Sequence, residues 1–154
     1  MENNIKNIWK KILGIMSHVF TFGAVFLTAF IIGRATPVFA LIYLIIFLSW
    51  YITIFWAYCS RCPCHFNCTH VYMGRLASKI FKTKRESSSS IDYPINNLLL
   101  IAVLIYPQYW LKDNLYIFSG FWLVMIAMGP LITPLYCPEC ENTSCPVHRL
   151  FKRV

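Results

Sequence analysis

The sequence predicts an all-α integral membrane protein. We expect a four-transmembrane-helix bundle, made of two tandem helical hairpins, with a Cys/His-rich metal-binding cap on the cytoplasmic side. Hydrophobic residues make up 58% of the 154-residue chain and charged residues only 13%, against about 25% charged in an ordinary soluble domain. Four long stretches carry no charge, and cysteines and histidines cluster after the second and the fourth. We therefore treat 1–154 as a single membrane domain.

The four charge-free stretches are residues 12–33, 35–60, 93–111 and 114–138. A helix needs about 20 apolar residues to cross a hydrocarbon core about 30 Å thick, and all but the third stretch exceed that length. Four buried helices of a soluble protein would need polar faces towards water, and these stretches supply none. The first stretch is also longer than a signal-peptide core and has no small-residue cleavage site, so we expect it to be retained.

The first hairpin is expected to consist of spans 12–33 and 37–58. Only Arg34, Ala35 and Thr36 separate the two spans, and so short a connection requires that they run antiparallel. Proline is well tolerated in the first turn of a helix, because the N–H that it lacks has no partner there. Pro37 therefore suits the start of the returning helix.

The second hairpin is expected to consist of spans 95–111 and 115–136. The first of these is short and contains Pro107, and Lys112-Asp113-Asn114 turns the chain into the second. Proline removes a helical hydrogen bond and clashes with the preceding turn. Pro130 and Pro134 should therefore interrupt the last turns of the fourth span.

The distribution of Lys and Arg predicts the orientation. Twelve of them lie in the N-terminal segment, the loop between the hairpins and the C-terminal tail, and two lie in the short turns. Positive residues are retained on the cytoplasmic side, so both termini and the middle loop should be cytoplasmic. The net charge of +8 then faces anionic lipid headgroups. Because this charge is spread along an interface, we expect the lipid bilayer as a partner and no nucleic acid.

The middle loop contains a stretch, residues 70–85, with the pattern of a short interfacial helix. Its apolar residues recur at helical spacing and basic residues lie beside them, namely Tyr72, Leu76 and Ile80 with Arg75, Lys79 and Lys82. A helix of this kind lies in the plane of the membrane surface. The serine-rich stretch 86–90 that follows is expected to be a flexible linker.

Two Cys/His segments, 59–70 and 137–148, follow the second and fourth spans on the predicted cytoplasmic side. They repeat one pattern, Y-C-x-x-C-x5-C-x-H and Y-C-x-x-C-x4-C-x-x-H. A C-x-x-C turn directs two thiolates at one ion, and a third cysteine with a nearby histidine completes a tetrahedron. Cys64 has no counterpart in the second segment. The predicted metal ligands are Cys59, Cys62, Cys64, Cys68, His70, Cys137, Cys140, Cys145 and His148.

Three chemistries remain open for these residues, and we favour iron–sulfur clusters. Cys62, Cys137 and Cys145 precede proline, as the last cysteine of ferredoxin ligand runs does, although the spacing matches neither common ferredoxin run. Zinc is the alternative, since two Cys3His sets satisfy its coordination and leave Cys64 spare. Structural disulfides are disfavoured in a reducing cytoplasm and by the odd number of cysteines, seven.

His18 is the one histidine inside a predicted span. An ionisable side chain within the membrane is a functional-site candidate, and a neutral imidazole could donate a hydrogen bond to a quinone carbonyl. Haem held by two histidines is disfavoured, because no other span contains a histidine. Simple packing with a hydrogen bond to a neighbouring helix is the alternative to a cofactor contact.

These observations favour a small multi-pass subunit that carries a cytoplasmic metal centre. We expect it to act in electron transfer, or as the anchor of a membrane redox complex, with other subunits or a soluble cytoplasmic redox protein as partners. The alternatives are a zinc-stapled scaffold or assembly subunit and a membrane thiol oxidoreductase, although four-span thiol oxidoreductases work on the oxidising face. No phosphate-binding loop, H-E-x-x-H motif or nucleophile elbow occurs, and we assign no catalytic residue.

We predict that both termini are cytoplasmic, because twelve Lys and Arg residues lie in the segments assigned to that side and two in the turns. A reporter that fluoresces only after export should therefore stay dark when it is fused to the C-terminus. The same reporter fused to a known exported protein is the positive control. Fluorescence of the C-terminal fusion would overturn the predicted orientation.

Overall fold

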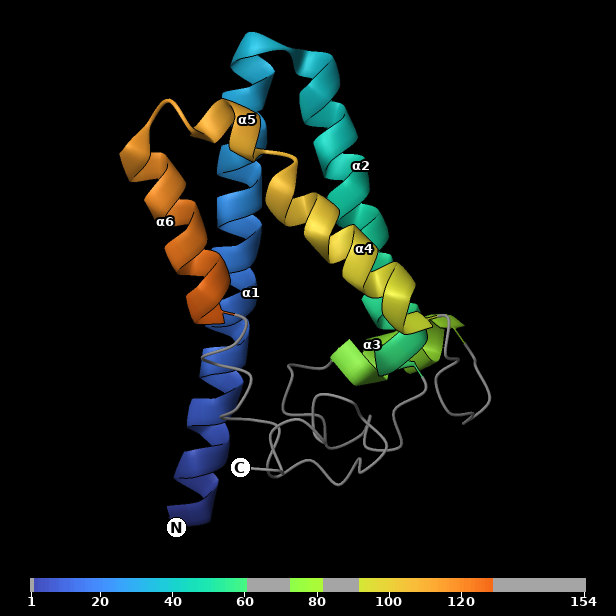
Figure 1. The fold of residues 1–154 in the computed structure, drawn as a ribbon. Coiled ribbons are helices and arrows are strands. Elements are labelled where there is room, and N and C mark those ends of the chain that lie inside the picture. The colour runs from blue at the N-terminus through green and yellow to red at the C-terminus, as the bar shows by residue number, and fades with distance from the viewer. Residues whose placement is uncertain (1, 61–72, 82–91, 129–154) are drawn as a thin grey trace.

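The computed structural model describes residues 2–60, 73–81 and 92–128, and all regular structure among them is helical. Figure 1 shows the arrangement. The elements are α1 (Glu2–Ala35), α2 (Pro37–Ile54), the π-helical turn η1 (Phe55–Cys59), α3 (Met73–Phe81), α4 (Asp92–Ile105), α5 (Gln108–Leu111) and α6 (Leu115–Ile126).

The first hairpin has the expected form, with α1 and α2 antiparallel and adjacent (Figure 1). Thr36 is extended, and its carbonyl accepts hydrogen bonds from the N–H groups of Phe39 and Ala40 at 3.2 and 3.3 Å. Pro37 begins α2. Helix α1 starts ten residues before the predicted span 12–33, because the charges at Lys10 and Lys11 limit a membrane span without ending a helix.

Pro107 divides the predicted third span into α4 and α5, since its ring cannot donate the hydrogen bond that a continuous helix needs. The Pro107 carbonyl instead accepts from Trp110 and Leu111 at 3.0 and 3.1 Å and so starts α5. Asn114 caps α6, because its side-chain oxygen accepts from the Ile117 N–H at 3.3 Å. Helix α6 begins at the residue predicted for the fourth span, and residues 129–136 of that span lie outside the described part.

Two helical stretches in the described part are long and apolar enough to cross a membrane, Ile12–Ala35 and Pro37–Ala57. Helix α6 is apolar but has 12 residues, and α4 ends at the break before Pro107. The described residues therefore contain two candidate spans where the sequence predicts four.

Helix α2 packs against both α1 and α4, while α6 packs on α1 (Figure 1). The turns at Thr36 and at 112–114 lie at one end, and α3 and the N-terminus lie towards the other. The core is small and joins three helices through Val25, Ala29, Ile32, Tyr43, Phe47 and Val103.

Many large apolar side chains are exposed on each of the long helices. Phe30 of α1, Leu98 of α4 and Leu123 of α6 are 64%, 68% and 70% exposed. Soluble monomers rarely expose continuous apolar surface of this kind, whereas lipid is as apolar as these side chains. The outer surface of the described helices is therefore the one expected of helices surrounded by lipid.

An aromatic face on α2 makes its contacts with both neighbouring helices. Its rings recur every fourth residue and so form a ridge inclined to the helix axis, at Phe39, Tyr43, Phe47 and Tyr51 of α2 and at Phe55 of η1. Tyr43 stacks on Tyr106 at the end of α4, with ring centroids 5.9 Å apart and planes 4° apart. Phe22 of α1 meets the rings of Phe47 and Tyr51 at 5.3 and 5.1 Å.

Removing the two hydroxyls of the stacked pair Tyr43 and Tyr106 should change the free energy of unfolding in opposite directions. The Tyr106 hydroxyl donates to the Phe39 carbonyl at 3.2 Å. Tyr43 is 0% exposed, and its hydroxyl has no hydrogen-bond partner within the described part. We predict that Tyr43→Phe raises the free energy of unfolding by about 1 kcal/mol, because a desolvated hydroxyl is removed, and that Tyr106→Phe lowers it by about 1 kcal/mol.

Unfolding of the purified protein by SDS in mixed micelles, followed by tryptophan fluorescence, measures both variants. Each variant keeps its aromatic ring and therefore the stacking contact, so a change in stability reports the hydroxyl alone. A Tyr43→Phe variant that unfolds more easily than Tyr106→Phe would contradict this account of the core.

Candidate functional site

Of the nine predicted metal ligands, the structure describes Cys59. It is the last residue of η1 and is half-buried. No group of three or more His, Cys, Asp or Glu side chains within residues 2–60, 73–81 and 92–128 could hold a metal ion. The other eight predicted ligands lie outside these residues, namely Cys62, Cys64, Cys68, His70, Cys137, Cys140, Cys145 and His148. The metal-ligand sets of the two Cys/His segments therefore stay a prediction.

The π-helical turn η1 orients Cys59 at the end of α2. Its hydrogen bond runs from the Ser60 N–H to the Phe55 carbonyl at 2.9 Å, and the Ser60 hydroxyl donates to the Trp56 carbonyl at 2.6 Å. A π turn holds one residue more than an α turn, so Cys59 is rotated relative to its place in an uninterrupted α-helix. Such turns occur frequently at functional sites.

His18 of α1 lies against the aromatic face of α2 and is half-buried. Its ring meets the Tyr51 ring edge-on, with centroids 6.3 Å apart and planes 86° apart. Tyr51 also contacts Phe47 and Phe55, at 5.9 and 5.1 Å. Tyr51 precedes Cys59 by eight residues, roughly 12 Å along a helix. The structure therefore places His18 inside an aromatic cluster about two turns from Cys59.

The end of α6 lies against the same part of α1. The Ser17 hydroxyl donates to the Met128 carbonyl at 3.4 Å. Ser17 is adjacent to His18, and Met128 is the last described residue before the second Cys/His segment. Figure 1 shows α2 and α6 running towards the same end of the bundle, away from the two turns. The two described helices that precede the Cys/His segments in the chain therefore end on the same side of the bundle.

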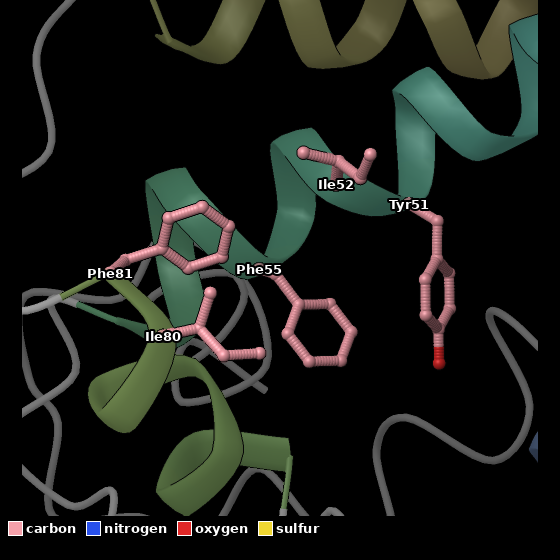
Figure 2. A pocket seen from close by; sticks show the side chains of 5 residues that line it. All are labelled: Tyr51, Ile52, Phe55, Ile80 and Phe81. Atoms are coloured by element: carbon pink, nitrogen blue, oxygen red, sulfur yellow. The ribbon is translucent and has the colours of Figure 1, made fainter.

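Residues 73–81 of the predicted interfacial helix form α3, which packs on η1. Ala77 is buried, while Leu76, Lys79 and Ile80 are exposed. Figure 2 shows an apolar pocket of about 430 Å³ where α3 meets the end of α2, lined by Tyr51, Ile52, Phe55, Ile80 and Phe81. Sequence reasoning missed this pocket, although the four-residue repeat of aromatics on α2 was a signal for one of its walls.

Within residues 2–60, 73–81 and 92–128, fold and site together define a helical protein with two helices long and apolar enough to cross a membrane and a half-buried cysteine just after the second of them. Comparison with protein-family models, curated proteins and solved structures finds no match for this chain. The function is therefore argued from the residues themselves.

The aromatic cluster around Tyr51 predicts a large loss of stability when its central ring is removed. We expect Tyr51→Ala to lower the free energy of unfolding by about 3 kcal/mol, the usual cost of removing a large packed aromatic ring. Tyr116, which is 89% exposed, is the matched control, and Tyr116→Ala should change stability by less than about 0.5 kcal/mol. If the two variants lost the same free energy of unfolding in SDS, the packing of Tyr51 against His18 and Phe22 would not stabilise the fold.

Proposed function

We propose that the protein is a four-span membrane subunit that carries a metal centre on its cytoplasmic face and transfers electrons there. The observation that carries this proposal is the common direction of α2 and α6. Helix α2 leads through η1 to Cys59, and α6 leads to Met128 beside Ser17, at the same end of the bundle. Two metal-binding segments can cooperate when the helices that precede them end on one side.

The four spans of this proposal are 12–33, 37–58, 95–111 and 115–136, with both termini cytoplasmic. The common position of the two turns supports it, because tandem hairpins require their turns on one face (Figure 1). Lys112 lies over the Tyr109 ring, with its Nζ 4.6 Å from the ring centroid. Aromatic and basic side chains of this kind are typical of the membrane–water interface, which fits the turn at 112–114 as the outer boundary.

In this proposal the thiolates and histidines of the two Cys/His segments hold the metal. Cys59 fits a ligand role by position, because it is half-buried at the end of η1, directly before the rest of the first Cys/His segment. Iron–sulfur clusters are ligated by cysteine thiolates, and a cluster would supply a one-electron carrier at the membrane surface. The partners would be a soluble redox protein on the cytoplasmic side or other subunits of a membrane complex.

His18 has a separate place in this proposal, as a contact for a quinone within the membrane. Its support is position, since its ring is half-buried beside Tyr51 and about two turns of α2 separate Tyr51 from Cys59. An imidazole N–H that reaches a quinone carbonyl would hold the carrier near the metal-bearing end. Packing against Tyr51 alone is the competing role.

A zinc-stapled scaffold is the second candidate, and one sequence observation favours it. Each Cys/His segment contains three cysteines and a histidine in matching order, and that set closes a zinc site by itself. Zinc would then tie each loop to its helix end, and its binding free energy would stabilise the fold. No electron transfer would occur in that case.

Metal content and colour separate the two candidates. We predict that protein purified anaerobically is brown, absorbs at about 400 nm and contains iron. Cys59→Ser and Cys140→Ser should each lose metal and folded yield, because metal binding contributes to folding. Ser49→Ala, which changes an exposed residue of α2, is the control and should keep full metal content. Colourless protein with stoichiometric zinc would contradict the redox role.

A further pair of variants tests whether the segments share a ligand. If Cys64 completes a four-thiolate set with Cys137, Cys140 and Cys145, Cys64→Ser should damage that centre while His148→Ala leaves it intact. If each segment closes on its own histidine, the effects are reversed. Metal analysis and absorption spectra of the two variants distinguish these outcomes, and a silent Cys64→Ser with a metal-depleted His148→Ala would exclude a shared cluster.

A further inference from the structure

The apolar pocket between α3 and the end of α2 has the properties of a ligand site. Its volume of about 430 Å³ falls within the roughly 300–1,000 Å³ of small-molecule sites. Its walls come from two elements far apart in sequence, with Tyr51, Ile52 and Phe55 on one side and Ile80 and Phe81 on the other (Figure 2). It is a shallow hollow, more open than enclosed, so a ligand could enter without separating the helices.

The apolar lining of the pocket favours a hydrocarbon ligand. No polar atom of the described residues lines the pocket, and a polar group placed there would lose its hydrogen bonds to water without replacement. A sugar, a nucleotide or a quinone head is therefore disfavoured. An acyl chain is favoured, because it loses nothing by leaving the bilayer core for an apolar pocket.

The basic residues of α3 favour an anionic headgroup on a lipid that binds there. Lys79 is exposed and directly precedes Ile80, which lines the pocket. Helix α3 carries Arg75 and Lys79 and no acidic residue. Each basic residue near an anionic membrane surface contributes about 1 kcal/mol of attraction, so an anionic headgroup is favoured over a zwitterionic one.

We propose that this pocket binds one anionic phospholipid, with an acyl chain between α2 and α3 and the phosphate at Lys79. The site goes beyond the proposed electron transfer, because it requires neither a metal nor a redox partner. A lipid held there would fix α3 against η1 and hence against Cys59.

The preference for an anionic headgroup is tested with full-length protein in nanodiscs that contain equal amounts of phosphatidylglycerol and phosphatidylcholine. Native mass spectrometry of the released protein counts the retained lipids. We expect wild type to retain phosphatidylglycerol about fivefold over phosphatidylcholine, and Lys79→Gln to lose that preference. Lys112→Gln removes an exposed lysine near the turn at 112–114 and should keep it. Equal retention of the two lipids by wild type would overturn the proposal.

The pocket is tested by filling it. Ile80→Trp should abolish retention of the lipid, whereas Leu76→Trp, one turn earlier on α3 and outside the pocket lining, should not. Retention by Ile80→Trp equal to wild type would overturn the proposal. If Ile80→Trp fails to fold by circular dichroism, Lys79→Gln decides the matter, since it changes an exposed side chain. Inorganic phosphate should not displace the lipid, and displacement would show a free phosphate site instead.

Discussion

The structure depends on the aromatic face of α2. Lipid offers no hydrophobic driving force between helices, so association in a membrane depends on packing and hydrogen bonds. Rings at every fourth residue give α2 a continuous surface, on which Tyr43 meets Tyr106 and Tyr51 meets His18 and Phe22. Tyr43 and Phe47 of this face belong to the small core that joins α2 to both α1 and α4.

The same face connects the core to the candidate site. It continues through Phe55 into the π turn and ends at Cys59, so the packing that holds α2 between α1 and α4 also places the first predicted ligand. On the other side, the hydrogen bond from Ser17 to Met128 holds the end of α6 against α1. His18 lies next to that bond in the chain and contacts Tyr51 in space. One short section of α1 is therefore in contact with both helices that lead to Cys/His segments.

Helix α3 adds a link between this end of the bundle and the membrane surface. Helix α3 packs on η1, and Ala77 of α3 is buried. The π-helical segment η1 forms part of the wall of the pocket between α3 and α2, since Phe55 belongs to both. A ligand in that pocket would stiffen the element that carries Cys59. A lipid bound there as proposed would then be linked through α3 to the proposed metal site at Cys59.

The sequence by itself determined the helical class, the first hairpin turn at Thr36, the start of α6 after Asn114 and the helix at α3. Each depends on a local signal, such as a charge-free run, a proline, a cap or an amphipathic repeat. It placed Pro107 inside one continuous third span, and the division of that span into α4 and α5 came from the structure. Only the tertiary structure decided that Tyr43 stacks on Tyr106, that His18 meets Tyr51, and that Ile80 and Phe81 close a pocket with α2. These contacts depend on the rotation of each helix about its axis. Hydropathy does not report that rotation when all faces of a helix are apolar, because lipid and protein interior are then chemically alike.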